Sequence, residues 1–319
     1  MKIKPKFLLQ FSLIAILLTA CNGVIPTPTP TPIPTPTPTP QPTSAASSIS
    51  YHFVTSKLTV PTTQAQADSL GLNIDGDPQN RADNLFGNLL TLINSTISDL
   101  EMQSTIDQAI SNGEIVTLHS FKTNDPLNTS SATWSVFLGQ TSQGAPRFDG
   151  TDQFTLFSGA PTNTQITGTL TNGHFAGGPG EVRAQIMVLG SRIDVGLIGV
   201  RVEADVNEKG CTNGKLGGGI AVSEFRSTVL PALAAGLNQV VAANPDMANN
   251  ILSIFDTDQN GSITADELEN NFIIKLATTP DIDLLDATGK FNPRQDGVKD
   301  SMSIGMGFTC APAIFTEPE

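Results

Sequence analysis

The chain has few of the residues that most often build catalytic centres. Its 319 residues include three histidines and three cysteines, and His52, His119 and His174 are scattered without the spacing of a metal-binding set. Neither a Gly-x-Ser-x-Gly nucleophile motif nor a His-Glu-x-x-His helix motif occurs. Two carboxylates that meet only in the folded chain stay possible, because the fold sets their separation. The sequence therefore indicates no class of enzyme.

Basic residues are also scarce. The chain has 17 Lys and Arg against 30 Asp and Glu, which gives a formal net charge of −13. Such a surface repels the phosphates of nucleic acids and of anionic lipids, so we expect neither as a partner. Only 15% of the residues are charged, and the body is rich in Thr, Asn, Ser and Gly. This composition suits strands and turns outside a cell better than a disordered acidic tail.

Long apolar runs are missing except near the N-terminus. Three lysines within the first six residues precede an apolar run at residues 7–18, which is too short to span a bilayer comfortably and is typical of a secretory signal peptide. The following Leu18-Thr-Ala-Cys21 resembles the lipobox of bacterial lipoproteins, which implies cleavage before Cys21 and acylation of that residue. Ordinary signal cleavage, with Cys21 incidental, is the alternative. Removal of the signal peptide takes away three lysines and no acid, and so would lower the formal charge from −13 to −16.

Residues 24–43 alternate Pro and Thr almost strictly, with an interruption at Ile33. Because every second residue has a fixed φ and no amide donor, helix and sheet ladders are excluded and polyproline II remains. At about 3.1 Å per residue, the segment could hold the body roughly 60 Å above a membrane. We expect a stiff spacer. A docking site for domains that bind proline-rich segments is the weaker alternative, since those domains are mostly intracellular.

If Cys21 carries lipid, Cys211 and Cys310 are the only cysteine pair left. Export would bring them into a compartment that permits disulfides. A bridge between them would close a loop of about a hundred residues, for which the chain-entropy argument gives a stabilisation of up to about 4.7 kcal/mol. Two separate buried thiols are the alternative, because the sequence does not determine their separation.

Residues 256–267, Asp-Thr-Asp-Gln-Asn-Gly-Ser-Ile-Thr-Ala-Asp-Glu, place an oxygen donor at each position that calcium coordination requires. Calcium takes six to eight hard oxygen ligands at roughly 2.3–2.6 Å. Gly261 occupies the sixth position, where the chain must turn sharply. This is the pattern of an EF-hand loop. The expected ligands are the carboxylates of Asp256 and Asp258, the amide oxygen of Asn260, the carbonyl of Ser262, Thr264 directly or through a water, and both oxygens of Glu267.

Amphipathic segments flank this loop on both sides, as an EF-hand requires. Asn244 before Pro245 indicates a helix start, and we expect a helix–loop–helix at residues 244–278. An acidic turn between two helices that binds no metal is the alternative. The apolar residues that recur at helical spacing are Met247, Ile251, Leu252 and Phe255 before the loop, and Leu268, Phe272, Ile273 and Leu276 after it.

A second group of oxygen donors precedes the first helix predicted in the body. The residues could wrap a calcium ion as in thrombospondin type 3 or dockerin-like loops. The match departs from those loops, because Pro78 stands where a glycine is expected and two extra residues delay Asp83. A turn rich in Asp and Asn, with Asn80 or Asp83 capping the helix, is nearly as well supported. The candidate ligands are Asn73, Asp75, Asp77, Asp83 and Asn84.

The body, residues 49–319, shows helical periodicity at both ends and strand periodicity between them. Apolar residues recur at helical spacing in 82–93, 98–112 and 222–241, whereas the short segments between 115 and 206 alternate and are separated by Gly, Asn, Asp and Pro. Residues 301–308 indicate a final strand that returns to the central sheet. We predict one α+β domain, an antiparallel sandwich-like sheet flanked by helices, after a signal peptide at 1–20 and an anchor with spacer at 21–48.

Five segments spread over the body carry a resemblance to known proteins. They are Gly71-Leu-Asn-Ile-Asp-Gly-Asp77, Asp83-Asn-Leu-Phe-Gly87, Lys215-Leu-Gly-Gly-Gly-Ile220, residues 256–267 and Lys299-Asp-Ser-Met-Ser-Ile-Gly-Met-Gly-Phe308. With these segments the chain resembles a group of bacterial surface lipoproteins, of myxobacterial type, that contain an EF-hand calcium loop. The likeness covers most of the body and implies a surface lipoprotein with calcium loops. Since the group has no assigned activity, no catalytic residue is implied.

Three classes of function remain in view. We expect an exported calcium-binding protein that is anchored to a bacterial membrane by lipid, with its body in the periplasm or on the cell surface. Its role would be structural or binding, with calcium stabilising the fold and an unidentified protein or glycan as ligand. An extracytoplasmic hydrolase with a calcium-stabilised fold is the enzyme alternative. A calcium sensor of the cytosolic type is weakest, because export removes the low-calcium background and no second complete hand is evident.

Overall fold

The computed structural model describes residues 48–318, except for 80–81, 97–100, 160, 162–163 and 190. The chain divides into two units, Met1–Ala45 and Ala46–Glu319, and all described residues belong to the second. The predicted signal peptide, Cys21 and the proline–threonine spacer therefore lie outside the described residues.

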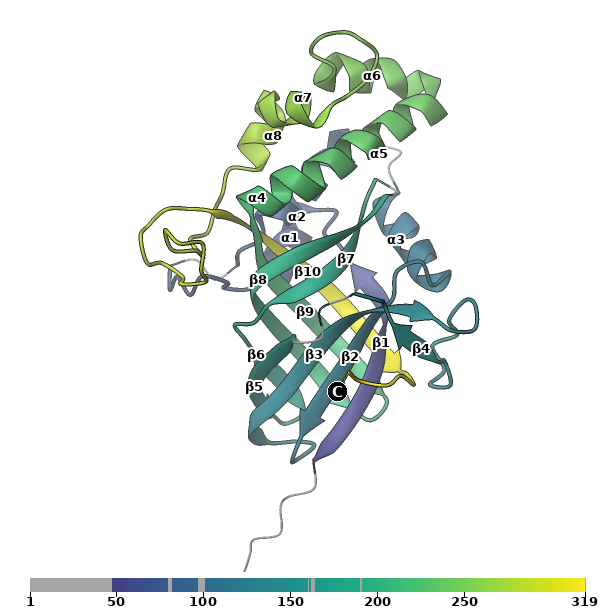
Figure 1. The fold of residues 1–319 in the computed structure, drawn as a ribbon, viewed down its shortest axis with the longest axis vertical. Helices are drawn as coiled ribbons and strands as arrows, with labels where there is room; N and C mark the ends of the chain where they lie inside the picture. Colours follow the sequence, from purple (N-terminus) through teal and green to yellow (C-terminus); the bar gives the residue numbers. More distant parts are fainter. Residues whose placement is uncertain are drawn as a thin grey trace, which may run out of the picture. The chain divides into compact units, whose positions relative to one another are not determined.

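Ten strands, eight α-helices and one π-helical turn make up the described part of the chain (Figure 1). The strands are β1 (Ile49–Thr59), β2 (Thr117–Thr123), β3 (Thr129–Thr141), β4 (Phe154–Leu156), β5 (Gln165–Thr171), β6 (His174–Gly177), β7 (Val182–Val188), β8 (Ser191–Asn207), β9 (Gly210–Ala221) and β10 (Ser301–Pro312). The helices are α1 (Gln64–Leu70), α2 (Leu85–Thr96), α3 (Met102–Ser111), α4 (Val222–Glu224), the π-helical turn η1 (Phe225–Val229), α5 (Leu230–Ala243), α6 (Pro245–Phe255), α7 (Ala265–Asn270) and α8 (Phe272–Ala277).

The strands form one antiparallel sheet that closes on itself. Neighbouring strands follow the order β2-β1-β10-β9-β8-β6-β5-β3, and β3 also pairs with β2. Short β4 extends the sheet beside the end of β3, and β7 pairs with the first half of β8. β8 lies largely within the alternating part of the sequence, and Val200, Val202 and Ala204 along it are fully buried. The turn between β5 and β6 is Asn172-Gly173, with positive φ at both residues, as a tight hairpin of this kind requires.

The prediction of an α+β fold with a large antiparallel sheet and several helices is confirmed. The sandwich-like arrangement is not confirmed, because a sandwich consists of two facing sheets, whereas here β3 bonds to β5 on one side and to β2 on the other. A bulge between Thr129 and Ala132 of β3 and register shifts in β8 accompany this closure, and such irregularities increase strand bending and twist. β1 and α1, which precede the first predicted helix, were not expected from the sequence.

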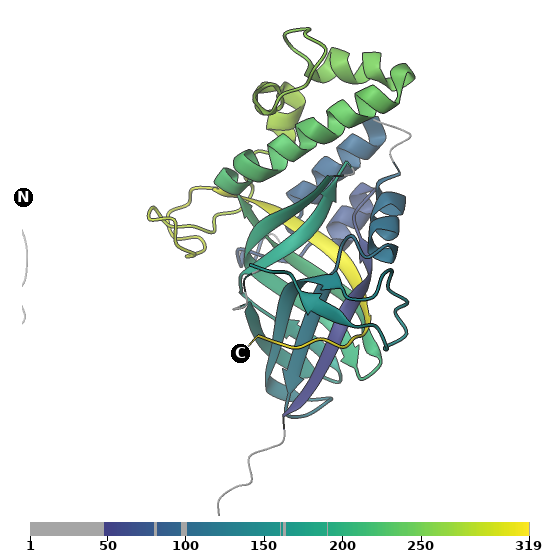
Figure 2. The same cartoon turned by 45° about the vertical axis from the view of Figure 1, so that its right-hand side comes forward.

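Helices cover the sheet in two groups. Helices α1, α2 and α3 contact β10 and β1, whereas α5 contacts β7 and β8 and carries α6 and α7 on its other side. Figures 1 and 2 show α5–α8 gathered beyond one end of the strands. Residues 278–300 return from α8 to β10 without a helix or named strand. The loop between α6 and α7 is thus connected to the sheet mainly through α5.

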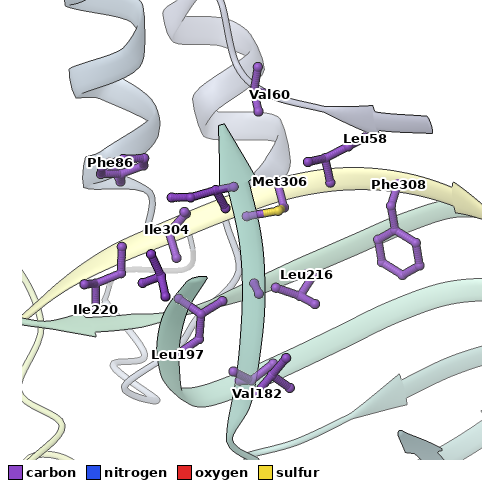
Figure 3. Close-up of a cluster of buried hydrophobic side chains, with 14 of the residues drawn as sticks. Leu58, Val60, Phe86, Val182, Leu197, Leu216, Ile220, Ile304, Met306 and Phe308 are labelled. Carbon is purple, nitrogen blue, oxygen red and sulfur yellow. The ribbon is translucent and has the colours of Figure 1, made fainter. Parts of the chain in front are cut away.

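β10 is buried on both of its faces. Its large residues point to the main core, where Ile304, Met306 and Phe308 lie near Leu216 of β9 (Figure 3). Its small residues allow helices to lie close on the other face. At Gly305, an added Cβ would come within 2.5 Å of the Leu70 carbonyl oxygen at the end of α1. The alternation of large and small residues in 301–308 therefore reflects two packed faces.

A disulfide joins β9 to β10. Cys211 and Cys310 are paired residues of these antiparallel neighbours, with their Cα atoms 4.7 Å apart and 99 positions apart in the sequence. The helices α4 to α8 lie in the chain between the two cysteines. The covalent bond therefore encloses the whole C-terminal helical segment.

Candidate metal centre

The loop of residues 256–267 lies between two helices that each begin with a side-chain cap. The Asn244 side chain accepts a hydrogen bond from the Met247 N–H at the start of α6, which ends at Phe255, directly before the loop. Thr264 and Glu267 form a capping box at the start of α7, which satisfies two backbone donors that a helix leaves free. Of the apolar residues in and beside the loop, Ile251, Phe255, Ile263 and Leu268 are buried in the main core, whereas Phe272 and Ile273 are exposed. The single outgoing helix expected from the sequence is divided at Asn271 into α7 and α8. The helix–loop–helix geometry of this segment thus follows from local capping and from burial on α5.

Three carboxylates meet in this loop. Asp256, Asp258 and Glu267 each have one oxygen within 4.8 Å of the others. Asp256 and Glu267 are each only 9% exposed. Among the described residues, no other group of three or more His, Cys, Asp or Glu side chains comes this close together. Ionised carboxylates at such distances repel one another, and a bound divalent cation relieves that repulsion.

Glu267 is the most strongly bonded of the three. Its Oε2 accepts hydrogen bonds from the N–H and the hydroxyl of Thr264, both at 2.9 Å. Its Oε1 accepts from the Thr257 N–H at 2.8 Å, from the Thr257 hydroxyl and from the Asp258 N–H. These bonds, with the Thr264 amide first, lower the pKa of Glu267 from 4.5 to about 2. The side chain is therefore anionic at neutral pH, and a cation bound by both oxygens would compete with some of these donors.

The other two carboxylates shape the turn between the helices. Asp256 accepts from the N–H groups of Asn260 and Gly261, at 3.1 and 2.8 Å. Asp258 accepts from the Asn260 N–H and from its side-chain amide, at 3.1 and 2.8 Å. Gly261 has φ +84, as its sixth position demands, and Gln259 also has positive φ. These hydrogen bonds to the two carboxylates thus fix the turn between α6 and α7.

The structure places the remaining predicted ligands around the same turn. The Asn260 side-chain oxygen accepts from the Ser262 N–H at 2.8 Å. The Thr264 hydroxyl donates to Glu267 and accepts from the Glu267 N–H at 3.2 Å. All the residues predicted as oxygen ligands therefore lie in one short loop, which fits the ligand chemistry of calcium.

One residue of this centre was not found from the sequence. Asn238, in the middle of α5, bonds to both backbone groups of Ile263. The residues are 25 positions apart, and only the packing of α5 against the loop brings them together. Asn238 and the neighbouring Gln239 are polar residues in a mostly apolar helical segment, which is a weak signal, because such residues are more often exposed to solvent.

The second predicted group, before α2, is a tightly bonded turn. Asp75 accepts from the Asp77 N–H, Asp77 accepts from the Gln79 N–H, and Asn73 donates to the Asp77 carbonyl. The bonds accepted by Asp75 and Asp77 are those of Asx turns. The carboxylates do not form a group of three within the described residues, and residues 80–81 are not among those. Calcium binding at this turn stays a prediction.

Asp83 and Asn84, the other members of that group, bond to the protein itself. Asp83 is 1% exposed and accepts from the Ile74 N–H at 2.7 Å. The Asn84 side chain donates to the carbonyls of Ala67 and Gly305 and accepts from the N–H groups of Gly87 and Gly305. Asn84 thereby joins α1, the first turn of α2 and β10. Its side chain has no free position for a metal without the loss of these bonds.

The three histidines do not come together in one site, and each has different hydrogen-bond partners. His119 is buried and bonds to Thr55 and Trp134, and burial lowers its pKa from 6.5 to about 3, so it is neutral. Because its Nδ1 accepts from the Trp134 indole, its Nε2 carries the proton and donates to the Thr55 hydroxyl. His52 pairs with Glu317, and His174 pairs with Asp205. Each ring thus has a separate bonding role.

A pocket of about 370 Å³ lies beside α7 and α8. Its lining includes the apolar residues Phe225, Leu230, Ile274 and Met302, and its charged residues are Arg226, Glu269 and Lys275. The single carboxylate, Glu269, is paired with the Arg226 guanidinium at 2.8 Å. Glycoside hydrolysis by two facing carboxylates requires a second acid, which this pocket does not supply.

Among the described residues, the group of three carboxylates in the 256–267 loop is accordingly the strongest indication of a functional site. No helix in the described ranges is long and apolar enough to cross a membrane. Comparisons of the chain with protein-family models, with curated proteins and with solved structures give no match.

Proposed function

We propose that residues 256–267 form an EF-hand-type calcium site and that bound calcium stabilises the C-terminal helices on the sheet. The observation that carries this proposal is the convergence of the Asp256, Asp258 and Glu267 carboxylates within 4.8 Å. These three would hold the ion, together with oxygens of Asn260, Ser262 and Thr264. Calcium would supply positive charge at the point where the protein gathers three negative ones.

A structural role fits the packing of the helices better than a switching role does. A calcium sensor opens its helix pair and exposes apolar surface when the ion binds. Here the flanking residues Ile251, Phe255 and Leu268 belong to the core that also contains the strands. Exposure of these residues would therefore disrupt the main core. We infer that calcium holds the loop and both helices in the arrangement described.

The location of the protein is a separate proposal that rests on sequence alone. The signal peptide, the lipobox-like segment at Cys21 and the proline–threonine spacer support an exported, lipid-anchored protein with its body held away from the membrane. At the millimolar calcium concentrations found outside cells, a loop of modest affinity would be largely occupied. Export and a structural calcium site are thus mutually consistent.

Thermal unfolding with calcium and with chelator tests the calcium site. Extracellular sites commonly have Kd values of about 10⁻⁴–10⁻³ M, so millimolar calcium should stabilise the fold by about 0.4–1.4 kcal/mol. For a domain of this size, that corresponds to a rise in Tm on the order of 1–5 °C. The Asp256→Ala/Glu267→Gln double variant should lose this response. The mature chain with Cys21→Ser, which cannot be acylated there, is a suitable background.

Asp286→Ala is the matched control. Asp286 also accepts hydrogen bonds within a tight turn, from Thr288 and Lys290, but it is outside the carboxylate group. The control should keep the full calcium response even if its Tm in chelator falls. An equal calcium response in wild type and in the double variant would disprove the site. Calcium-driven binding of a dye for apolar surface would favour a sensor instead.

A further inference from the structure

Ile263 has an unusual hydrogen-bonding partner for a residue in the middle of a loop. Its N–H donates to the Asn238 Oδ1 at 2.8 Å, and its C=O accepts from the Asn238 Nδ2 at 2.7 Å. Two bonds to the N–H and C=O of one residue are what a neighbouring antiparallel strand would provide. In this protein a single carboxamide on α5 provides both. The Ile263 side chain is 2% exposed, so its backbone and side chain are both held.

The requirement at position 238 is specific. A carboxamide carries a donor and an acceptor on one planar group, whereas a carboxylate only accepts and an aliphatic side chain does neither. The neighbouring Leu237 is 2% exposed in the main core, and α5 contacts β8. Asn238 therefore lies on a helix that packs on the sheet, and its two hydrogen bonds hold Ile263 of the loop at a fixed position relative to that helix.

The two bonds orient the atoms on the opposite edge of the loop. Peptide groups are planar and trans, so the C=O and N–H of one peptide point in opposite directions. Because the Ile263 C=O points to Asn238, the Thr264 N–H points away from it, and it reaches Glu267 Oε2 at 2.9 Å. Because the Ile263 N–H also points to Asn238, the Ser262 C=O must face the side on which Glu267 lies. That carbonyl is one of the oxygens expected to bind calcium.

We propose that Asn238 is a positioning residue for the calcium loop, which presents the Ser262 carbonyl and holds the Thr264 amide against Glu267 before the ion arrives. The proposal rests on the calcium site proposed above. Pre-organised ligands bind more tightly because less ordering accompanies binding. Removal of residues that orient metal ligands typically weakens metal affinity by about 10- to 100-fold. Asn238 should therefore affect calcium affinity without contacting calcium.

Calcium titration calorimetry on the mature Cys21→Ser chain tests this role. Asn238→Leu has nearly the same size and loses both hydrogen bonds, so we expect its Kd for calcium to rise by about tenfold or more. Gln239→Leu is the matched control, because it removes an exposed amide from the next position of α5. Its Kd should stay within about twofold of the wild-type value. If Asn238→Leu does not fold, Asn238→Ser is used, since its single short hydroxyl cannot bridge both groups.

Amide hydrogen exchange without calcium separates positioning from general stability. In Asn238→Leu, exchange should accelerate at Ile263 and Thr264, while the amides of β8 and β9 keep their protection. An unchanged Kd despite faster exchange at Ile263 would overturn the proposal and leave the calcium site intact. A uniform loss of protection with an unchanged Kd would mean that Asn238 only stabilises the fold. If the wild type itself binds no calcium, the proposed function fails, and the positioning role fails with it.

Discussion

Asp83 is a buried acid, and its environment raises the pKa of its carboxyl group toward neutrality. Burial raises its pKa from 3.8 to about 6, although the hydrogen bond from the Ile74 N–H acts in the opposite direction. The charges of Asp75 and Asp281 raise it further. Between pH 3.8 and about 6 the folded protein therefore binds more protons at Asp83 than the unfolded chain does. This contribution to stability is present in acid and is lost as the pH rises through that window.

Asp83→Asn should remove this pH dependence. Asparagine can still accept the Ile74 hydrogen bond but does not ionise. The Tm of the variant minus that of the wild type, measured in chelator, should therefore increase between pH 4 and about 6 and then level off. Asp68→Asn, at an exposed position of α1, is the control and should give a flatter difference. A flat curve for Asp83→Asn as well would contradict the buried, raised-pKa state.

The same variant also tests calcium binding at the turn before α2. In a background that carries Asp256→Ala and Glu267→Gln, calcium should have no effect on Tm if this turn is held only by its own hydrogen bonds. A calcium-dependent rise at pH 7 that disappears with Asp83→Asn would instead establish a second site.

At the residue scale, the predictable part of the metal centre is the part that is local in the chain. The 256–267 spacing puts three carboxylates in one turn, because a loop of this length folds back on itself around Gly261. Asn238 could not be predicted in the same way, since its contact depends on how α5 packs over the loop. Asn84 shows the opposite case: its polarity suggested a ligand, but its four hydrogen bonds serve the packing of α1 and β10.

Among the elements, β10 depends most on its small residues. A methyl group at Gly305 would meet the Leu70 carbonyl oxygen at 2.5 Å, and the Gly305 N–H and C=O both bond to Asn84. We expect Gly305→Ala to destabilise the fold by about 1–3 kcal/mol, as forced overpacking usually does. Urea unfolding measures this difference directly.

Gly307→Ala is the comparison within the same strand. The nearest atom to its added Cβ would be Leu70 Cδ2 at 3.0 Å, which is the end of a side chain that can move. Its effect should therefore be smaller than that of Gly305→Ala. Equal effects at the two positions would show that the approach of the α1 backbone does not limit the packing.

The type of each element was more predictable than its partners. Alternation between 115 and 206, with Gly, Asn, Asp and Pro between the alternating segments, predicted strands and turns there, because both signals are local. Alternation shows which face of a strand is buried, but it does not say which strand lies beside it. The pairing of β2 with β3 that closes the sheet was therefore not visible, and a sandwich was expected. β1 was missed although its segment, Tyr-His-Phe-Val-Thr from position 51, is rich in aromatic and β-branched residues.

On the scale of the whole molecule, the Cys211–Cys310 disulfide connects parts of the chain that are far apart in sequence. We expect the Cys211→Ala/Cys310→Ala variant to lose about 2–5 kcal/mol of unfolding free energy, the usual effect of losing a native disulfide. Intact mass after alkylation checks the bond itself: no thiol of this pair should be modified without reductant, and two should be modified after reduction. Two freely alkylated thiols in the folded, unreduced protein would contradict it.

That disulfide also bears on how the protein would withstand proteases outside a cell. Residues 287–299, in the segment between α8 and β10 that has no helix or named strand, are almost all exposed. Exposed connections of this kind are where enzymes cut chains. A cut there would separate β10 from the helices along the backbone. The two fragments would nevertheless stay covalently joined through the sulfur atoms on β9 and β10, and the last strand could not diffuse away. A nicked molecule would thus keep both of its pieces on the same membrane anchor, if Cys21 carries one.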